Sequence, residues 1–329
     1  MRAVVLIGPT AVGKSAVAQW IAEQTGAAIL SADSMLVYRG MDIGTAKPTP
    51  AERGSVPYFG IDCVDPGQPF STGDWLSFVH RQLAANEGME NGKWKMENSS
   101  DSHSPFLIVA GGTGLYVKAL LFGLDAPPSD PAARARWTAL FESGGLPALR
   151  AAVDANPVAR ALLPDSDLAN PRRLIRALER ADSSDRTSLS TPSGAGRSPS
   201  GQMVSPAVAG LTMPRAMLAA RIERRIAKMF ADGLVEEAVA VRETSGGLSS
   251  TACGAIGYAE ALAVADGKMT RDEAAERIAA RTRQLAKRQM TWFRHQLKVE
   301  WVEVDETDTP ATIGPKVMEV WKRNGYFEI

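Results

Sequence analysis

The residues Gly8-Pro-Thr-Ala-Val-Gly-Lys-Ser15 constrain the fold of this 329-residue chain more than any other feature. They match the pattern G-x-x-x-x-G-K-[ST], in which glycines allow backbone N–H groups to surround phosphate oxygens. An apolar run at 3–7 precedes them, as expected for a buried strand, and apolar positions within 15–24 recur at helical spacing. A strand, a phosphate-binding loop (P-loop) and a helix in this order predict an α/β protein that binds phosphate at the helix N-terminus.

The residue types of the loop suggest a separate role for each polar side chain at the phosphate. Lys14 is expected to neutralise a phosphate oxygen, Ser15 to hold Mg²⁺ as the cofactor, and the Thr10 hydroxyl to add a contact. The predicted phosphate site therefore comprises Gly8, Pro9, Thr10, Ala11, Val12, Gly13, Lys14 and Ser15, with Ser15 as the metal ligand.

Further strands and helices alternate along the chain, which predicts a parallel sheet flanked by helices. Strands are expected at 28–30, 106–110 and 207–213, an edge strand at 299–304, and a long helix from the Thr270-x-x-Glu273 capping box to about 297. We predict a P-loop NTPase-like core from 1–123 and 207–329, a mostly helical insertion from 124–182, and a flexible low-complexity loop from 183–206. A second exposed excursion is expected at 87–104.

Composition excludes several classes of protein. The 37 basic and 37 acidic side chains balance, and only two cysteines, Cys63 and Cys253, are present, which fits a reducing compartment. The opening apolar run is too short for a signal sequence or a membrane helix. We expect a cytoplasmic monomer that does not enter a membrane. A net charge of zero does not exclude nucleic acid, because a local basic surface is sufficient for binding.

The strand ends give the first indication of the reaction. The strand at 106–110 runs into Gly111-Gly-Thr113 and has no aspartate at its tip, unlike most P-loop hydrolases and kinases. Asp33 follows the strand at 28–30 instead. Since the carboxyl ends of parallel strands face one crevice, Asp33 and Thr113 are expected to point toward the ligand of the P-loop.

Six segments in the same order resemble the tRNA dimethylallyltransferase family. The resemblance implies a P-loop core with a helical insertion, and transfer of a dimethylallyl group from dimethylallyl diphosphate to N6 of adenosine 37 beside the tRNA anticodon. The segments are Gly8–Ser15, Asp33–Pro48, Gly111–Tyr116, Asn170–Glu179, Ala255–Tyr258 and Arg283–Trp292.

The chemistry of such a transfer gives these residues roles. Asp33 would accept the N6 proton as general base, and Thr113 would orient the amine or the bridging oxygen. The resemblance makes Arg134 a substrate contact and places Ser34, Met35 and Leu36, with Asp33, at the tRNA. Arg221, on the helix after 207–213, is expected to reach the diphosphate.

Two basic helices favour RNA as the partner. Asn170-Pro171 is a helix start, after which arginines recur on one face, and the helix of 270–297 has no acidic residue from 281 to 298. Within that helix, Ile278, Leu285, Trp292 and Phe293 are expected to form a buried stripe. Such basic faces follow phosphates by releasing counterions. The predicted tRNA-binding residues here are Arg172, Arg173, Leu174, Ile175, Arg176, Arg281 and Arg288.

Two other enzymes remain open from the sequence. An adenylate isopentenyltransferase would perform the same chemistry on free AMP, ADP or ATP and would need no extended basic surface. A P-loop small-molecule kinase would need ATP turnover and a lid arginine. A pure RNA-binding module is disfavoured, because Asp33 and Thr113 would then have no purpose.

Overall fold

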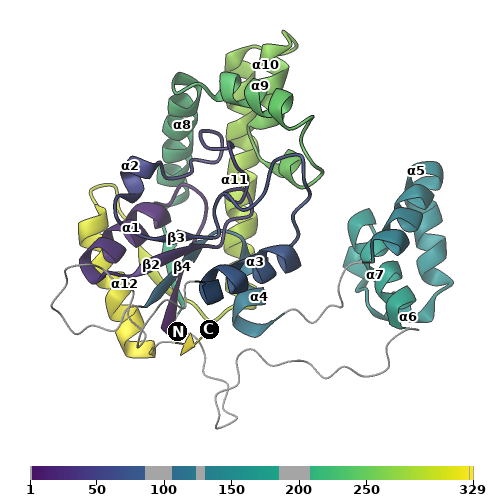
Figure 1. Cartoon of the computed structure of the whole chain (residues 1–329), viewed down its shortest axis with the longest axis horizontal. Helices are drawn as coiled ribbons and strands as arrows, with labels where there is room; N and C mark the ends of the chain where they lie inside the picture. Colours follow the sequence, from purple (N-terminus) through teal and green to yellow (C-terminus); the bar gives the residue numbers. More distant parts are fainter. Residues whose placement is uncertain (1, 86–105, 124–129, 185–207, 326, 329) are drawn as a thin grey trace. The chain divides into compact units, whose positions relative to one another are not determined.

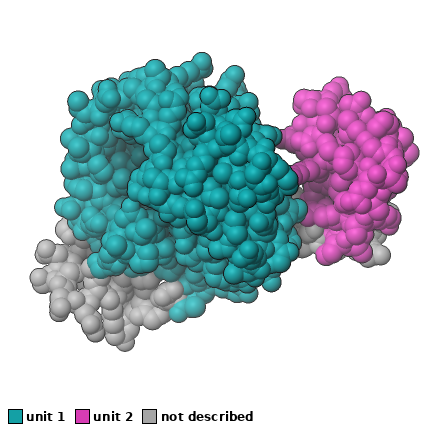
Figure 2. Space-filling model, turned by 90° about the horizontal axis from the view of Figure 1, so that it is seen from above, with its two compact units in different colours: residues 1–122, 195–329 teal, residues 123–194 magenta. Residues whose placement is uncertain are grey.

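The computed structural model describes residues 2–85, 106–123, 130–184, 208–325 and 327–328. These form two compact units, one of residues 1–122 and 195–329 and the other of residues 123–194, coloured separately in Figure 2. Most of the loop predicted at 183–206 and the whole excursion at 87–104 lie outside the described residues, whereas residues 183 and 184 continue a helix.

The first unit is built on a parallel sheet, which confirms the predicted fold class. Its strand order is β3-β2-β4-β1-β5-β6, and β7 pairs antiparallel with β1. The strand predicted at 106–110 is the fourth along the chain, because the short strand β3 precedes it. The strands are β1 (Arg2–Ile7), β2 (Ala28–Ser31), β3 (Tyr58–Phe59), β4 (Leu107–Gly111), β5 (Val208–Thr212), β6 (Glu300–Glu303) and β7 (Phe327–Glu328).

Helices cover both faces of this sheet (Figure 1). Val4 and Leu6 of β1 pack in the core beneath α1 and α12, whereas Val5 and Ile7 pack in the core on the other face. This explains why β1 reads as a continuous apolar run and not as an alternating one. The helices of the first unit are α1 (Lys14–Thr25), α2 (Pro50–Arg53), α3 (Thr72–Ala85), α4 (Gly114–Phe122), α8 (Arg215–Ala231), α9 (Leu234–Thr244), α10 (Tyr258–Ala265), α11 (Arg271–Gln296) and α12 (Pro310–Asn324).

The register of the sheet brings the predicted site residues to one edge. Ile7 pairs with Gly111, and Ser31 pairs with Ala110, so β1, β2 and β4 end at nearly the same level. The segments that follow these strands are the P-loop, the turn at Asp33 and the Gly112–Thr113 turn. Parallel pairing therefore assembles the site from three distant parts of the chain.

The long helix α11 begins as its sequence predicts. Thr270 Oγ1 accepts a hydrogen bond from the Glu273 N–H, and the Glu273 carboxylate accepts one from the Thr270 N–H. Phe293 and Ile278 are buried as predicted, but Leu285 and Trp292 are only half-buried. None of the helices in the described ranges is long and apolar enough to cross a membrane.

The second unit is a small helical bundle with its own core. It consists of α5 (Pro131–Asp154), α6 (Pro157–Ala161), a 3-10 turn (Asp165–Asp167) and α7 (Pro171–Ser184). Helix α5 contains a kink at Gly145, whose φ of 63° lies in the left-handed region. Leu149, Val153 and Leu174 have no exposed surface and pack together with Leu178.

Candidate active site

The P-loop turns sharply between β1 and α1. Gly8 and Gly13 have φ values of 150° and 103°, and Ala11 adopts a left-handed φ of 66°. A Cβ on Gly8 would lie 2.7 Å from the Leu211 carbonyl oxygen of β5, so only glycine fits there. Helix α1 starts at Lys14, and Ser15 is exposed in its first turn. The loop thus presents a helix N-terminus, a lysine and an exposed hydroxyl together.

Lys14 is half-buried at the start of α1. Its Nζ donates a hydrogen bond of 2.7 Å to the Pro9 carbonyl oxygen. Burial lowers the pKa of Lys14 to about 8, the Asp33 carboxylate partly opposes this shift, and the Arg225 guanidinium adds to it. Lys14, Asp33 and Arg225 are therefore electrostatically coupled.

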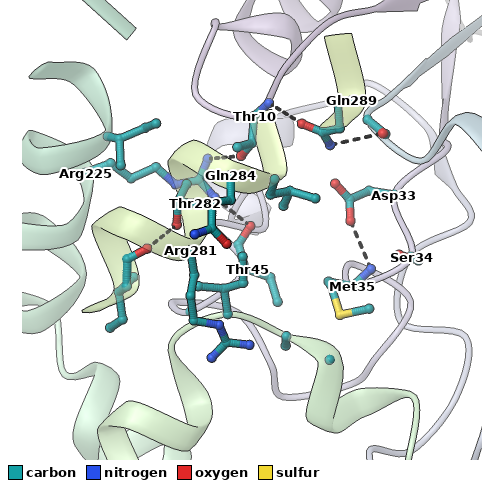
Figure 3. A pocket seen from close by; sticks show the side chains of 18 of the residues that line it. Thr10, Asp33, Ser34, Met35, Thr45, Arg225, Arg281, Thr282, Gln284 and Gln289 are labelled. Atoms are coloured by element: carbon teal, nitrogen blue, oxygen red, sulfur yellow. Dashed lines mark hydrogen bonds between the residues drawn. The ribbon is translucent and has the colours of Figure 1, made fainter. Parts of the chain in front are cut away.

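Arg225 on α8 is a site residue that the sequence analysis missed. It donates a hydrogen bond of 3.0 Å to the Thr45 carbonyl oxygen and a longer one of 3.5 Å to Thr10 Oγ1 (Figure 3). Burial lowers the pKa of Arg225. The predicted Arg221, one turn earlier, donates to the Val12 carbonyl oxygen at 3.1 Å and so supports the loop. The i, i+4 spacing from Arg221 was the signal available for Arg225.

Asp33 follows β2, Thr113 follows the neighbouring β4, and both line the same cavity. Asp33 Oδ1 accepts the Met35 N–H at 2.9 Å, and within the described ranges its second oxygen has no protein donor (Figure 3). Thr113 Oγ1 accepts the Ser34 N–H at 2.9 Å and lies 3.2 Å from Ser34 Oγ. The Thr113 hydroxyl therefore orients the turn that carries the proposed base.

A cavity of about 520 Å³ joins these elements. It brings together Thr10, Asp33, Ser34, Met35, Thr113, Arg281 and Arg288 of the predicted site residues. Thr10 is the one P-loop residue among the described residues that line it, and Leu36 is buried outside the lining, so a direct contact of the Leu36 side chain with substrate is not supported. Apolar residues of the lining include Ile222, Ile226, Met229, Ile256, Ile278 and Leu285.

Part of the positive charge of α11 is balanced by acids from other elements, which the helix sequence could not reveal. Arg281 forms an ion pair with Glu260, a buried residue of α10 that also accepts the Gly257 N–H. Arg288, at the cavity wall, is exposed. Glu260 therefore anchors Arg281, whereas Arg288 projects more freely.

Of the tRNA and substrate contacts predicted in the second unit, some side chains are accessible and others are buried or paired with acids. Leu174 is wholly buried in the core of the bundle, so its prediction as a tRNA contact was wrong. Arg134 and Arg176 both pair with the buried Glu179, and Arg173 pairs with Asp167. Arg172, Arg173 and half-buried Ile175 remain accessible. The substrate contact of Arg134 stays a prediction.

Glu237 on α9 holds the loop that positions Thr45. Its carboxylate accepts three backbone N–H groups, from Asp42, Ile43 and Gly44 at 2.7–3.0 Å, and the Tyr258 hydroxyl at 2.5 Å. Thr45, which follows, provides the carbonyl that binds Arg225.

Removing this carboxylate should destabilise the protein and weaken the Arg225 site. We expect Glu237→Ala to lower the free energy of unfolding by about 1–3 kcal/mol, because three N–H groups lose their acceptor. Glu237→Gln should lose less, since its amide oxygen still accepts. Urea denaturation measures both. The control Glu236→Ala removes only a surface ion pair, in which Glu236 lies 3.8 Å from Arg271. It should leave the free energy of unfolding unchanged. Equal stability of Glu237→Ala and wild type would contradict the assignment.

The donor set near the P-loop suits Mg²⁺ only when a phosphate shares the ion. No group of three or more His, Cys, Asp or Glu side chains that could hold a metal occurs among the described residues. Mg²⁺ commonly takes one or two protein ligands and completes its shell with phosphate oxygens and water. The exposed Ser15 hydroxyl at the loop fits that mode.

Comparisons with family models and with curated relatives agree on one family. The IPP transferase model matches residues 36–296, and the isopentenyl transferase model matches residues 1–57. A tRNA dimethylallyltransferase of Anaeromyxobacter dehalogenans (strain 2CP-C) is 39% identical over 304 residues, covering 92% of this chain and 95% of the relative. That of Geobacter metallireducens is 40% identical over 306 residues, with 92% of both chains covered.

Solved structures share the fold. The full-length tRNA isopentenylpyrophosphate transferase from Bacillus halodurans is 32% identical with a TM-score of 0.63, covering 98% of this chain and 97% of that one. A eukaryotic dimethylallyltransferase acting on tRNA has a TM-score of 0.65 at 18% identity, covering 99% of this chain and 77% of that one. The latter similarity concerns the fold alone.

Proposed function

This chain belongs to the IPP transferase family, and we propose that it transfers a dimethylallyl group from dimethylallyl diphosphate to N6 of adenosine 37 beside the tRNA anticodon. The observation that carries the proposal is one cavity that borders the P-loop at Thr10, the guanidinium of Arg225, the carboxylate of Asp33 and an apolar wall. A cationic phosphate cradle, a base and a hydrocarbon surface are the three requirements of this transfer.

The P-loop side fits the donor. Lys14, Arg225 and the N-terminus of α1 place positive charge where a diphosphate would leave. The apolar residues of α8 and α11 in the lining offer a surface for a five-carbon chain. When bound through Ser15 and the diphosphate, Mg²⁺ would neutralise part of the leaving charge.

The opposite side of the cavity fits the acceptor. In the reaction the carbon–oxygen bond of the donor breaks, a carbon–N6 bond forms, and one N6 proton leaves. The second oxygen of Asp33 is available for that proton, while the Met35 N–H holds the first oxygen and Thr113 holds the neighbouring Ser34 N–H. Diphosphate leaves with the electron pair of the broken bond, so charge and atoms balance.

An adenosine within tRNA must be extruded from its stack to reach such a cavity. Arg288 at the cavity wall and the exposed Arg172 and Arg173 of the second unit provide cations for the RNA backbone. A free nucleotide needs a pocket for one base and its phosphates only. The choice between tRNA and adenylate as acceptor therefore depends on whether these arginines contribute to binding of the acceptor.

The decisive assay supplies labelled dimethylallyl diphosphate and Mg²⁺ with either unmodified tRNA or AMP. We expect label in tRNA and none in AMP. Transfer to AMP at a rate equal to that on tRNA would support the adenylate isopentenyltransferase instead. In a separate assay with ATP, phosphorylation of a small molecule would support the kinase.

Arg172→Ala combined with Arg173→Ala should weaken tRNA binding and reduce its salt dependence. Removal of each phosphate-binding cation should flatten the log–log slope of affinity against salt by about one unit. We leave Arg176 intact because its removal would deprive the buried Glu179 of a partner. Filter binding at several salt concentrations measures the slope. The control Arg242→Ala removes a surface arginine paired with Asp266 in the first unit and should bind tRNA as wild type does. An unchanged slope in the double variant would exclude this surface.

A further inference from the structure

Gln289 on α11 links two parts of the site that are far apart in the sequence. Its Oε1 accepts the backbone N–H of Thr10 at 2.8 Å, and its Nε2 donates to the Gly112 carbonyl oxygen at 3.0 Å (Figure 3). Thr10 belongs to the P-loop, and Gly112 follows β4. A single carboxamide thus uses its acceptor on the phosphate side and its donor on the side of Thr113.

Two glycines allow α11 to approach this turn closely. A Cβ on Gly112 would lie 2.4 Å from Gln289 Nε2, and one on Gly114 would lie 2.2 Å from the Trp292 ring. These glycines flank Thr113, and the two α11 side chains above them are about one helical turn apart. The glycines are required by the approach of α11, which seats Gln289 against the backbone of Gly112, next to Thr113 in the chain.

The connection continues from this turn to the proposed base. The Thr113 N–H donates to the Ala32 carbonyl oxygen at 3.0 Å, and Thr113 Oγ1 accepts the Ser34 N–H at 2.9 Å. Ala32 and Ser34 are the two neighbours of Asp33. A hydrogen-bonded path therefore runs from Thr10 through Gln289 and the Gly112–Thr113 turn to the segment that holds Asp33.

We infer that Gln289 is a positioning residue that fixes the P-loop relative to Thr113 and Asp33, and so sets the distance between the leaving diphosphate and the base. The inference rests on the proposed function. The geometry matters because reacting groups displaced by about 1 Å lose on the order of 100-fold in rate. Both backbone groups that Gln289 binds lie at the cavity, where water can replace the amide, so its loss should disturb alignment more than folding.

The first test is Gln289→Met, which removes both hydrogen bonds but retains the length and approximate volume of the side chain. We expect kcat to fall about 10–100-fold, while KM for dimethylallyl diphosphate and the affinity for tRNA stay within about threefold. The thermal midpoint should remain near that of wild type. The matched control is Gln296→Met, on the same helix, which removes only an exposed hydrogen bond with Lys118 and should keep wild-type kcat.

A double-mutant cycle separates positioning from general weakening. If Gln289 acts through the Gly112–Thr113 turn, Gln289→Met combined with Thr113→Val should lose little more kcat than the worse single variant. Gly112→Ala provides a second variant, because its Cβ would displace the Gln289 amide without altering residue 289. It should reproduce the fall in kcat and have little further effect in a Gln289→Ala background.

Three results would overturn the inference: wild-type kcat in Gln289→Met, additive losses in the cycle, or a loss of kcat matched by equal losses of tRNA affinity and thermal midpoint. These differ from a failure of the proposed function, in which the wild-type enzyme itself would transfer no label to tRNA.

Discussion

Asp33→Asn is expected to lower kcat for prenyl transfer by at least about 100-fold, the usual magnitude for loss of a general base. Asparagine retains an oxygen that can accept the Met35 N–H, so the turn should keep its shape while the proton acceptor is lost. Binding of dimethylallyl diphosphate should not weaken, because a negative charge has been removed from near the phosphate site. Single-turnover kinetics at saturating donor and tRNA measures the effect on the chemical step.

The control for this variant is Asp65→Asn. Asp65 is an exposed carboxylate paired with Arg39 on the surface, and its replacement should leave kcat unchanged. Turnover at the wild-type rate in Asp33→Asn would show that the N6 proton leaves by another route. A large rise in KM for the donor with kcat retained would instead indicate that Asp33 organises the phosphate site.

Lys14→Met should reduce kcat by about 100-fold or more, because a cation aimed at the developing diphosphate charge is lost. It should also weaken binding of the donor. In Lys14 the ammonium is present below its pKa of about 8 and is lost as the pH rises above that value. In the free enzyme, kcat/KM for dimethylallyl diphosphate should therefore decline above about pH 8.

Lys14→Arg tests the origin of this decline, since guanidinium stays protonated throughout the range. Its kcat/KM is expected to be lower than that of wild type but flat above pH 8. A decline that persists unchanged in Lys14→Arg would assign the titration to another group. Titration of dimethylallyl diphosphate binding by calorimetry at pH 7 and pH 9 provides a readout independent of turnover.

The elements that the sequence predicted well carry their signals locally. The P-loop is defined by residue spacing, β1 and β4 by apolar runs, and the start of α11 by the Thr270 capping box. In contrast, β3 is a two-residue strand whose pairing with β2 depends on a neighbour elsewhere in the chain. No local pattern in two residues distinguishes such a strand from a loop.

The positions of Asp33 and Thr113 at one edge followed from the parallel order of the strands, which alternating strands and helices already implied. The packing and ion-pair partners of individual side chains could not be predicted from this strand order. Leu174, which lies among arginines at the start of α7, was predicted to touch RNA, but the bundle buries it together with Leu149 and Val153. Glu260 lies far from Arg281 in sequence, so the basic stretch of α11 read as unpaired.

The sequence by itself therefore determined which chemistry the chain carries: a phosphate loop, a carboxylate after β2 and a hydroxyl after β4. Only the tertiary structure decided how these groups are held. Arg225 entered the site because α8 lies beside the P-loop, where Arg221 and Arg225 bond to it, and Gln289 became the link between Thr10 and Gly112 because α11 packs on glycines. The physical reason is that residue type and spacing fix local backbone geometry and chemical capacity, whereas hydrogen-bond partners between distant segments depend on how helices pack against the sheet.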